Sequence, residues 1–174
     1  DSVLGLGAVT GAGEIVRCGG PWTKNSTGFD LARLIVGSEG TLALIVEATL
    51  RLVPRPAQQA TLRAFYRDAG AAADAVSRRM RQPQLPAMLE FIDARAITLL
   101  RRNGSDLPEA GAMLMIEADG DEDTLPLALT ALGAAAEGDG LLSLDVALDG
   151  LARDRLWAAR RALSPALRSI APGK

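Results

Sequence analysis

The chain has 174 residues, of which 48% are apolar, so it can bury a core and form one domain or two small ones. Its 19 basic and 21 acidic residues give a formal charge of −2 and form no basic cluster, which argues against a nucleic-acid partner. No apolar run approaches the ~20 residues of a membrane span, and no signal peptide is visible. We therefore expect a globular, cytoplasmic protein without a transmembrane segment, with peripheral membrane association as an alternative.

The cysteine and histidine contents limit the chemistry of the chain. Cys18 is the single cysteine, which excludes an internal disulfide and a multi-cysteine metal site. Histidine, the usual proton carrier near neutral pH and the commonest transition-metal ligand, is absent. We therefore assign no metal ligand and no catalytic residue within the chain. Because the sequence begins at Asp1 without a methionine and stops at Lys174 just after a helical pattern, we expect a piece of a longer protein.

Strand patterns separated by glycine-rich turns dominate the N-terminal third. Residues 2–17 contain two apolar runs around a "GAGE" turn, which predicts a β-hairpin. Residues 18–29 predict a loop, and Asp30 can cap a short helix with one apolar face. The run of Thr, Leu, Ile and Val over 41–53 predicts a buried strand. Two prolines within 54–59 predict a domain boundary.

Beyond this boundary, strand and helix patterns alternate. Short apolar runs predict strands over 62–67, 88–92, 113–118 and 141–148. Apolar residues at helical spacing predict helices over 69–80, between Asp93 and Asn103, over 125–136 and over 151–170. Four strands and four helices in this stretch indicate a compact α+β sandwich.

The "GSEGT" turn precedes the predicted strand over 41–53. Gly37 and Gly40 flank Ser38 and Glu39, so the backbone can turn sharply and present its N–H groups outward. A tight turn that leads into a rigid strand suits a cofactor site. It suits an ordinary hairpin corner equally well, so the spacing alone leaves both interpretations open.

Two faces can be traced along the predicted helix over 151–170. One is apolar and is expected to face the core; its residues are Leu156, Ala159, Leu163, Leu167 and Ile170. The other carries Arg153, Trp157, Arg160 and Ser164. This second face suits a solvated surface, or an anion site in which Arg160 beside Ser164 binds an acid. Ser164 before Pro165 is also a plausible cap at which the helix breaks and restarts.

One long motif, with several shorter segments in the same order, resembles a known family. The motif is "KNSTGFDLARLIVGSEGTLALIVEATLRLVPRP" over 24–56, and the further segments are "VLGLGAVTGAGEIVR", "LPAMLEFID", "MLMIEADG" and "RLWAARRALSPALRSIAPGK". Together they resemble the FAD-linked oxidases of the vanillyl-alcohol oxidase class. Within that class, the resemblance is to the branch of D-lactate dehydrogenases and the flavin subunit of glycolate oxidase.

The resemblance implies a two-part organisation of α+β class. Residues 1–56 would form the second part of a two-subdomain FAD-binding domain, and residues 57–174 an α/β-sandwich (ferredoxin-like) cap domain, both incomplete. The turn and the strand after it would lie against FAD, with Glu39 as part of the cofactor shell only. The implied cofactor-binding residues are Gly37, Ser38, Glu39, Gly40, Thr41 and Ile45.

The resemblance also implies a substrate site. Relatives that act on D-2-hydroxyglutarate resemble this chain at "LWAAR", and their carboxylate-binding residues correspond to Arg160, Ser164 and Lys174. The intervening segment is one residue shorter here before Lys174, and Ser164 stands where those relatives often have threonine. A monocarboxylate such as lactate or glycolate therefore stays open as the substrate.

The implied activity is oxidation of a D-2-hydroxy acid to the 2-oxo acid by hydride transfer to FAD. The family's glycine-rich FAD loop would precede Asp1 and its histidine-containing segment would follow Lys174, so we expect the isolated chain to be inactive. One alternative is a flavoprotein of the same class that acts on a non-carboxylate alcohol. Another is a non-catalytic role in docking a partner subunit or electron acceptor, which would require a large apolar patch on the cap.

Overall fold

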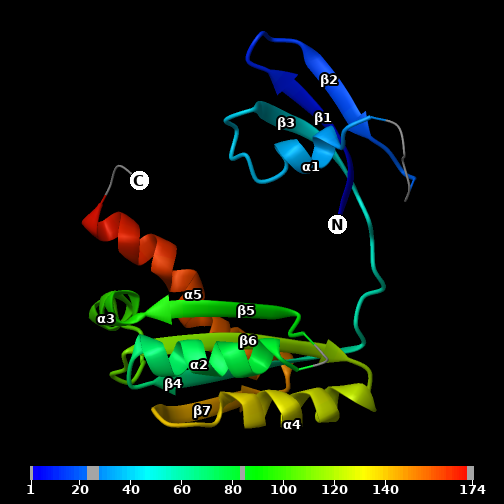
Figure 1. Cartoon of the computed structure of the whole chain (residues 1–174). Helices are drawn as coiled ribbons and strands as arrows, with labels where there is room; N and C mark the ends of the chain where they lie inside the picture. The colour runs from blue at the N-terminus through cyan, green and yellow to red at the C-terminus, as the bar shows by residue number, and fades with distance from the viewer. Residues whose placement is uncertain (1, 23–27, 83–84, 172–174) are drawn as a thin grey trace. The chain divides into compact units, whose positions relative to one another are not determined.

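The computed structural model describes residues 2–22, 28–82 and 85–171. The chain divides into two compact units, Asp1–Arg55 and Pro56–Lys174 (Figure 1). The division lies within the proline-containing stretch 54–59, where few apolar side chains are available for packing.

The first unit is a three-stranded antiparallel sheet with one short helix. Its strands lie in the order β2-β1-β3. The elements are β1 (Val3–Thr10), β2 (Ile15–Gly19), α1 (Leu31–Ile35) and β3 (Ala43–Leu50). The predicted hairpin is confirmed as β1 and β2, and the predicted cap of α1 is confirmed because the Asp30 carboxylate accepts a hydrogen bond from the Arg33 amide at 3.1 Å.

The strand expected over 41–53 is shorter and more exposed than its composition predicts. Strand β3 starts at Ala43 because the Thr41 amide is hydrogen-bonded within the preceding turn, to the Ser38 carbonyl. Only Ala43 of β3 is buried, so the expectation of a buried strand is wrong for this unit. The physical reason is the small core, which consists of Leu6, Ala8, Ala32, Ile35 and Ala43 and leaves most of β3 without a packing partner.

Over the described residues of the second unit, 56–82 and 85–171, the structure has four strands and four helices, as predicted. Its antiparallel strands lie in the order β5-β6-β4-β7, which is the ferredoxin-like order. The strands are β4 (Gln58–Tyr66), β5 (Met88–Asp93), β6 (Ala112–Gly120) and β7 (Leu141–Ala147). The helices are α2 (Ala69–Met80), α3 (Ala94–Arg102), α4 (Thr124–Ala136) and α5 (Gly150–Ile170).

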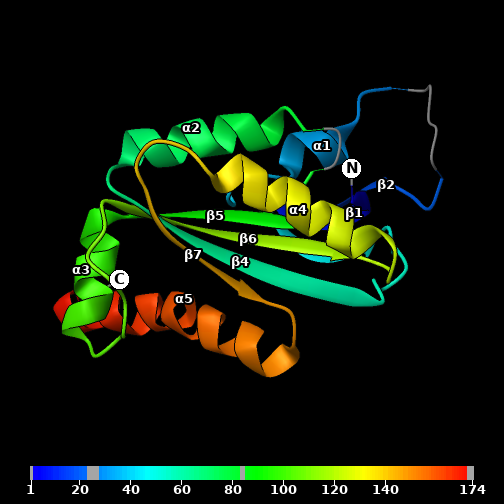
Figure 2. The same ribbon diagram turned by 90° about the horizontal axis from the view of Figure 1, so that it is seen from below.

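Helices cover both faces of this sheet. Figure 2 shows α2 and α4 on one side and α3 and α5 on the other. Because side chains alternate along a strand, β4 and β6 supply apolar residues to both sides. The α2/α4 face holds Leu62, Tyr66, Leu114, Ile116 and Leu132, among others. The α3/α5 face holds Phe65, Ile92, Ile97, Met113 and Met115, among others.

Helix α5 is continuous, which confirms the helix predicted over 151–170 and makes the alternative of a break at Ser164 and Pro165 wrong. The Asp149 carboxylate caps its start by accepting a hydrogen bond from the Ala152 amide at 2.8 Å. Pro165 lies inside the helix, where its missing N–H removes one backbone bond without ending the element.

The predicted apolar face of α5 is confirmed only in part. Ala159 is buried, and Leu156 and Leu163 pack against the α3/α5 core. In contrast, Leu167 and Ile170 are exposed. The end of α5 extends past the edge of the sheet, so these last residues find no part of the core beneath them (Figure 1).

Candidate functional site

The "GSEGT" turn is built from residues with positive φ. Gly37 and Gly40 have φ of 85° and 81°, which glycine adopts readily, and Glu39 has φ of 51°. The Ser38 carbonyl accepts hydrogen bonds from the Thr41 amide at 3.0 Å and from the Thr41 hydroxyl at 2.7 Å. The turn is therefore closed on itself and does not depend on the Glu39 side chain.

The outer side of this turn has unused hydrogen-bond donors. The amides of Gly37, Glu39 and Gly40 donate to no other residue that the structure describes. A Cβ added at Gly37 or Gly40 would meet nothing within 4 Å, so the space beside the backbone is open. Ile45 follows on β3, where it pairs with Ala8 and is part-exposed. Outward N–H groups in open space fit an electron-rich group such as a flavin.

A second polar site lies in the other unit, between α5 and the sheet. Thr61 on β4 and Glu117 on β6 are cross-strand partners on the α3/α5 face. One carboxylate oxygen of Glu117, Oε1, accepts hydrogen bonds from Arg153 Nη2 at 2.9 Å, Trp157 Nε1 at 3.0 Å and Thr61 Oγ1 at 3.2 Å. The Glu117 side chain is only 13% exposed, so this contact is a largely desolvated ion pair.

Arg160 lies one turn beyond Trp157 and is held by a different carboxylate. Its Nε donates to Glu90 Oε2 at 2.8 Å, and Glu90 holds the pKa of this guanidinium above its usual range. The Arg160 side chain is 41% exposed, and its Nη1 and Nη2 atoms donate to no residue within the described part of the chain. Glu90 thus fixes the guanidinium and leaves its outer fork available.

Two further predicted substrate residues have different outcomes. Ser164 is exposed on α5, one helical turn after Arg160, so the two lie on the same side of the helix. Lys174 lies outside the described residues. The interpretation of this helix face as a solvated surface is wrong for Arg153 and Trp157, because both pack against the sheet.

The sequence prediction missed Thr61, Glu90 and Glu117. Both glutamates sit in otherwise apolar strands, "MLEFID" and "MLMIEADG", where a buried carboxylate requires a partner. That break in the apolar pattern was the available signal. The identity of the partners, however, depends on contacts between residues far apart in sequence.

Neither a metal-binding cluster nor a membrane-spanning helix is present in the part of the chain that the structure describes. Across 2–22, 28–82 and 85–171, no group of three or more His, Cys, Asp or Glu side chains is placed to hold a metal ion. Over the same residues, no helix has both the length and the apolar character required to cross a bilayer.

Comparison with known proteins decides the family. Residues 55–173 match the family described as FAD linked oxidases, C-terminal domain. The chain belongs to the FAD-linked oxidases. The predicted family and its cofactor, FAD, are thereby confirmed.

This FAD-linked oxidase has relatives in the predicted branch. It is 37% identical over 174 residues to the glycolate oxidase subunit GlcD of Bacillus subtilis (strain 168), covering 99% of the chain and 37% of that relative. It is 42% identical over 100 residues to a D-lactate dehydrogenase of Archaeoglobus fulgidus, covering 56% of the chain and 22% of that relative. The chain thus spans less than two fifths of the length of these relatives.

A solved structure supports the fold of the FAD-linked oxidase. An alkyldihydroxyacetonephosphate synthase matches 98% of the chain and 34% of its own length, with a TM-score of 0.62 and 18% identity. At that identity the likeness supports the fold alone. The predicted α+β class is confirmed.

Proposed function

We propose that the protein carrying this chain is an FAD-dependent oxidoreductase that oxidises a D-2-hydroxy acid of the lactate or glycolate type to the 2-oxo acid. The observation that carries the proposal is the guanidinium of Arg160, which is fixed through Nε and open at its outer nitrogens. The related glycolate oxidase subunit and D-lactate dehydrogenase support this choice of substrate class.

In this proposal, residues 1–56 are part of the FAD-binding domain and residues 57–174 part of the cap. The amides of Gly37, Glu39 and Gly40 would donate to FAD, with Ser38, Thr41 and Ile45 as neighbouring contacts. Bound FAD would supply the hydride acceptor. The role of the chain here is to keep the turn rigid, since the Ser38 carbonyl already binds the amide and hydroxyl of Thr41.

Arg160 would orient the substrate through its carboxylate. The Glu90 carboxylate occupies Nε, so Nη1 and Nη2 can donate two parallel hydrogen bonds to one carboxylate group. The Ser164 hydroxyl, one turn along α5, would add a donor, and Lys174 is proposed as a further cation. Such a clamp restricts the acid to one orientation, which is how a binding contact contributes to rate.

Electron transfer onward from FAD would need an acceptor or a partner subunit. We include such a partner in the proposal because a related protein is named as a glycolate oxidase subunit. A cytoplasmic location, with contact to the membrane surface through the partner, completes the proposal.

Anaerobic bleaching of the bound flavin tests the activity. The purified full-length protein that carries this chain is reconstituted with FAD. It is then mixed with D-lactate, glycolate or D-2-hydroxyglutarate, or with propane-1,2-diol or benzyl alcohol as uncharged alcohols. We expect one of the acids to bleach the flavin and the alcohols to leave it oxidised. Bleaching by an alcohol alone would favour a non-carboxylate substrate, and a protein that binds no FAD would contradict the proposal at its centre.

The variant Arg160→Gln tests the proposed clamp. Loss of a charge-assisted contact with the substrate should lower kcat/KM for the acid by about 10–100-fold, while FAD binding stays unchanged. The matched control is Arg161→Gln, because Arg161 is the next residue on α5 and bonds to Asp154 on the same helix. Equal kcat/KM values for the wild type and Arg160→Gln would show that Arg160 does not bind the substrate.

A further inference from the structure

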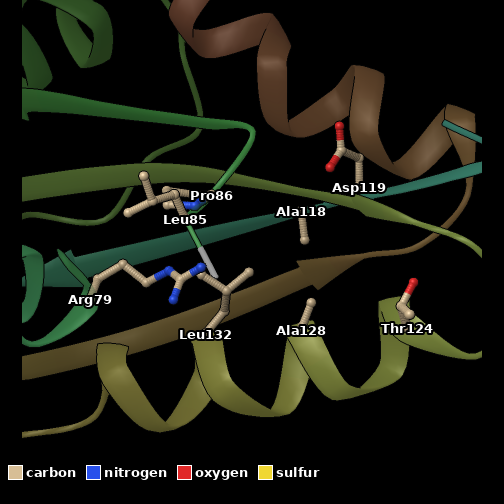
Figure 3. Close-up of a pocket in the computed structure, with 8 residues that line it drawn as sticks. All are labelled: Arg79, Leu85, Pro86, Ala118, Asp119, Thr124, Ala128 and Leu132. Carbon is tan, nitrogen blue, oxygen red and sulfur yellow. The ribbon is translucent and has the colours of Figure 1, made fainter. Parts of the chain in front are cut away.

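A pocket of about 330 Å³ lies on the α2/α4 face of the second unit, away from the face that carries Arg160. We name it the Arg79 pocket. It is formed by α2, α4, the end of β6 and residues 85–86 before β5 (Figure 3). Its lining residues are Arg79, Leu85, Pro86, Ala118, Asp119, Thr124, Ala128 and Leu132.

Arg79 is the unusual member of this lining. It is only 2% exposed, and its Nε and Nη1 atoms are buried with no hydrogen-bond partner among the residues that the structure describes. Burial lowers the pKa of this guanidinium, but an arginine keeps its charge in a protein. The neighbouring Arg78 adds to the positive charge, since its Nη2 is also buried and unpartnered and its Nε donates only to the Ala135 carbonyl.

Three other part-buried arginines of the same unit are each paired with a carboxylate. Arg63 bonds to Asp145 at 2.8 Å, Arg153 to Glu117 at 2.9 Å and Arg160 to Glu90 at 2.8 Å. A buried cation without a counter-charge is strongly unfavourable, so Arg79 lacks a partner that its environment requires. The planar guanidinium matches the geometry of a carboxylate or a phosphate.

The rest of the lining indicates what such an anion would be attached to. Leu85, Ala128 and Leu132 give the middle of the pocket an apolar wall. Figure 3 shows Arg79 at one end of the pocket and Thr124 toward the other, while the Asp119 side chain points from β6 to the opposite side of the strand from Ala118. Among the described residues that line the pocket, Arg79 is the one cation, so a second negative group on the ligand would find no counter-charge there.

We propose that the Arg79 pocket binds a small acid with a single oxyanion group, which contacts the Arg79 guanidinium while a short aliphatic part lies against Leu85, Ala128 and Leu132. The pocket lies across the sheet from the proposed substrate residues. Ligand binding there is therefore a separate function, and it stands whether or not Arg160 binds the substrate.

Thermal unfolding of the purified protein tests the proposal. The probes are hexanoate, inorganic phosphate and, as an uncharged control for hexanoate, hexan-1-ol. A ligand that binds only the folded state raises the unfolding midpoint, and we expect a rise of roughly 3 °C with hexanoate at about ten times its dissociation constant. Phosphate should give a smaller rise because it leaves the apolar wall uncovered, and hexan-1-ol should give none.

Two variants assign any effect to the pocket. Arg79→Met keeps the length of the side chain and removes its charge, so it should abolish the rise with both anions. Arg81→Met, on an exposed arginine two residues further along the chain, should leave the rise unchanged. Ala128→Leu fills part of the pocket beside its apolar wall. It should reduce the rise in unfolding midpoint with hexanoate more than the rise with phosphate.

Three results would overturn the proposal. One is a wild type whose midpoint rises with neither anion. Another is an equal rise in the wild type and Arg79→Met, which would place the anions elsewhere. Should Arg79→Met fail to fold, an Ala128→Leu response equal to that of the wild type would exclude hexanoate from the pocket.

Discussion

The two faces of the four-stranded sheet pack against their helices through different kinds of contact. On the α2/α4 face, the strands meet the helices through apolar side chains, and Tyr66 satisfies its hydroxyl on the Ala136 carbonyl at 2.9 Å. On the α3/α5 face, one end is apolar and the other is an array of ion pairs around Glu117 and Glu90. The contrast teaches that one sheet can be packed mainly through apolar contacts on one side and partly through paired charges on the other.

Removing apolar volume from the α2/α4 face should have the largest effect. Leu125 and Leu127 lie two residues apart on α4, at 6% and 70% exposure. Leu125→Ala should lower the free energy of unfolding by about 3 kcal/mol through lost burial and the cavity left behind, and Leu127→Ala by less than about 0.5 kcal/mol. Chemical denaturation of both variants measures the difference. Equal losses would mean that α4 does not pack as described.

Removing the shared acceptor on the α3/α5 face should have an intermediate effect. Glu117→Ala leaves Arg153, Trp157 and Thr61 without their common partner, so the free energy of unfolding should fall by about 2 kcal/mol. Glu117→Gln keeps a carbonyl acceptor and should lose less. The control is Glu109→Ala, because Glu109 is exposed and lies 3.8 Å from Arg101. If Glu117→Ala lowered the free energy of unfolding more than Leu125→Ala does, the ion pairs of the α3/α5 face would stabilise the fold more than the apolar contacts of the α2/α4 face.

The smallest effect should come from a helix cap, and it should depend on pH. Asp68 caps α2. The hydrogen bond from the Ala71 amide is the largest cause that lowers the pKa of Asp68, and the hydrogen bond from the Arg67 side chain is the second. A lowered carboxyl pKa stabilises the fold above the ordinary Asp pKa of about 3.9, and this stabilisation disappears as the pH falls through the lower folded-state value. The unfolding midpoint of wild type should therefore exceed that of Asp68→Asn slightly at pH 6, and the two should converge in strong acid.

A second aspartate provides the control for this titration. Asp123 stands at the start of α4 and makes no side-chain capping bond. Asp123→Asn should consequently follow the wild-type midpoint across the whole pH range. A gap between wild type and Asp68→Asn that persists well below pH 2 would show that the cap does not act through its charge.

Local patterns were sufficient to predict most of the fold. The caps at Asp30 and Asp93 and the alternating elements of the second unit follow from short-range rules, since each depends on residues within a few positions. The burial of β3 could not be predicted in this way, because burial depends on what packs against the strand. The alternative of a break at Pro165 is also wrong, because packing along α5 outweighs the loss of one backbone bond.

The candidate site was less predictable than the fold. The helical spacing of Arg153, Trp157 and Arg160 showed that they share a face. Their partners Glu117 and Glu90 lie 36 or more positions away along the sequence, and only the sheet register brings them beneath α5. The unpaired state of Arg79 was likewise invisible in the sequence, where it reads as an ordinary basic residue near the end of a helix.

The continuous course of α5 through Pro165 has a mechanical consequence. Without an amide hydrogen at Pro165, the Arg161 carbonyl loses its usual donor four residues on, and the helix is weakest there. The preceding turns are anchored to the sheet through Arg153, Trp157 and Arg160. Fraying that starts at the exposed Ile170 reaches the buried Ala166 before it reaches this weak point, so the last residues of the helix can open and close without disturbing the Arg160 guanidinium.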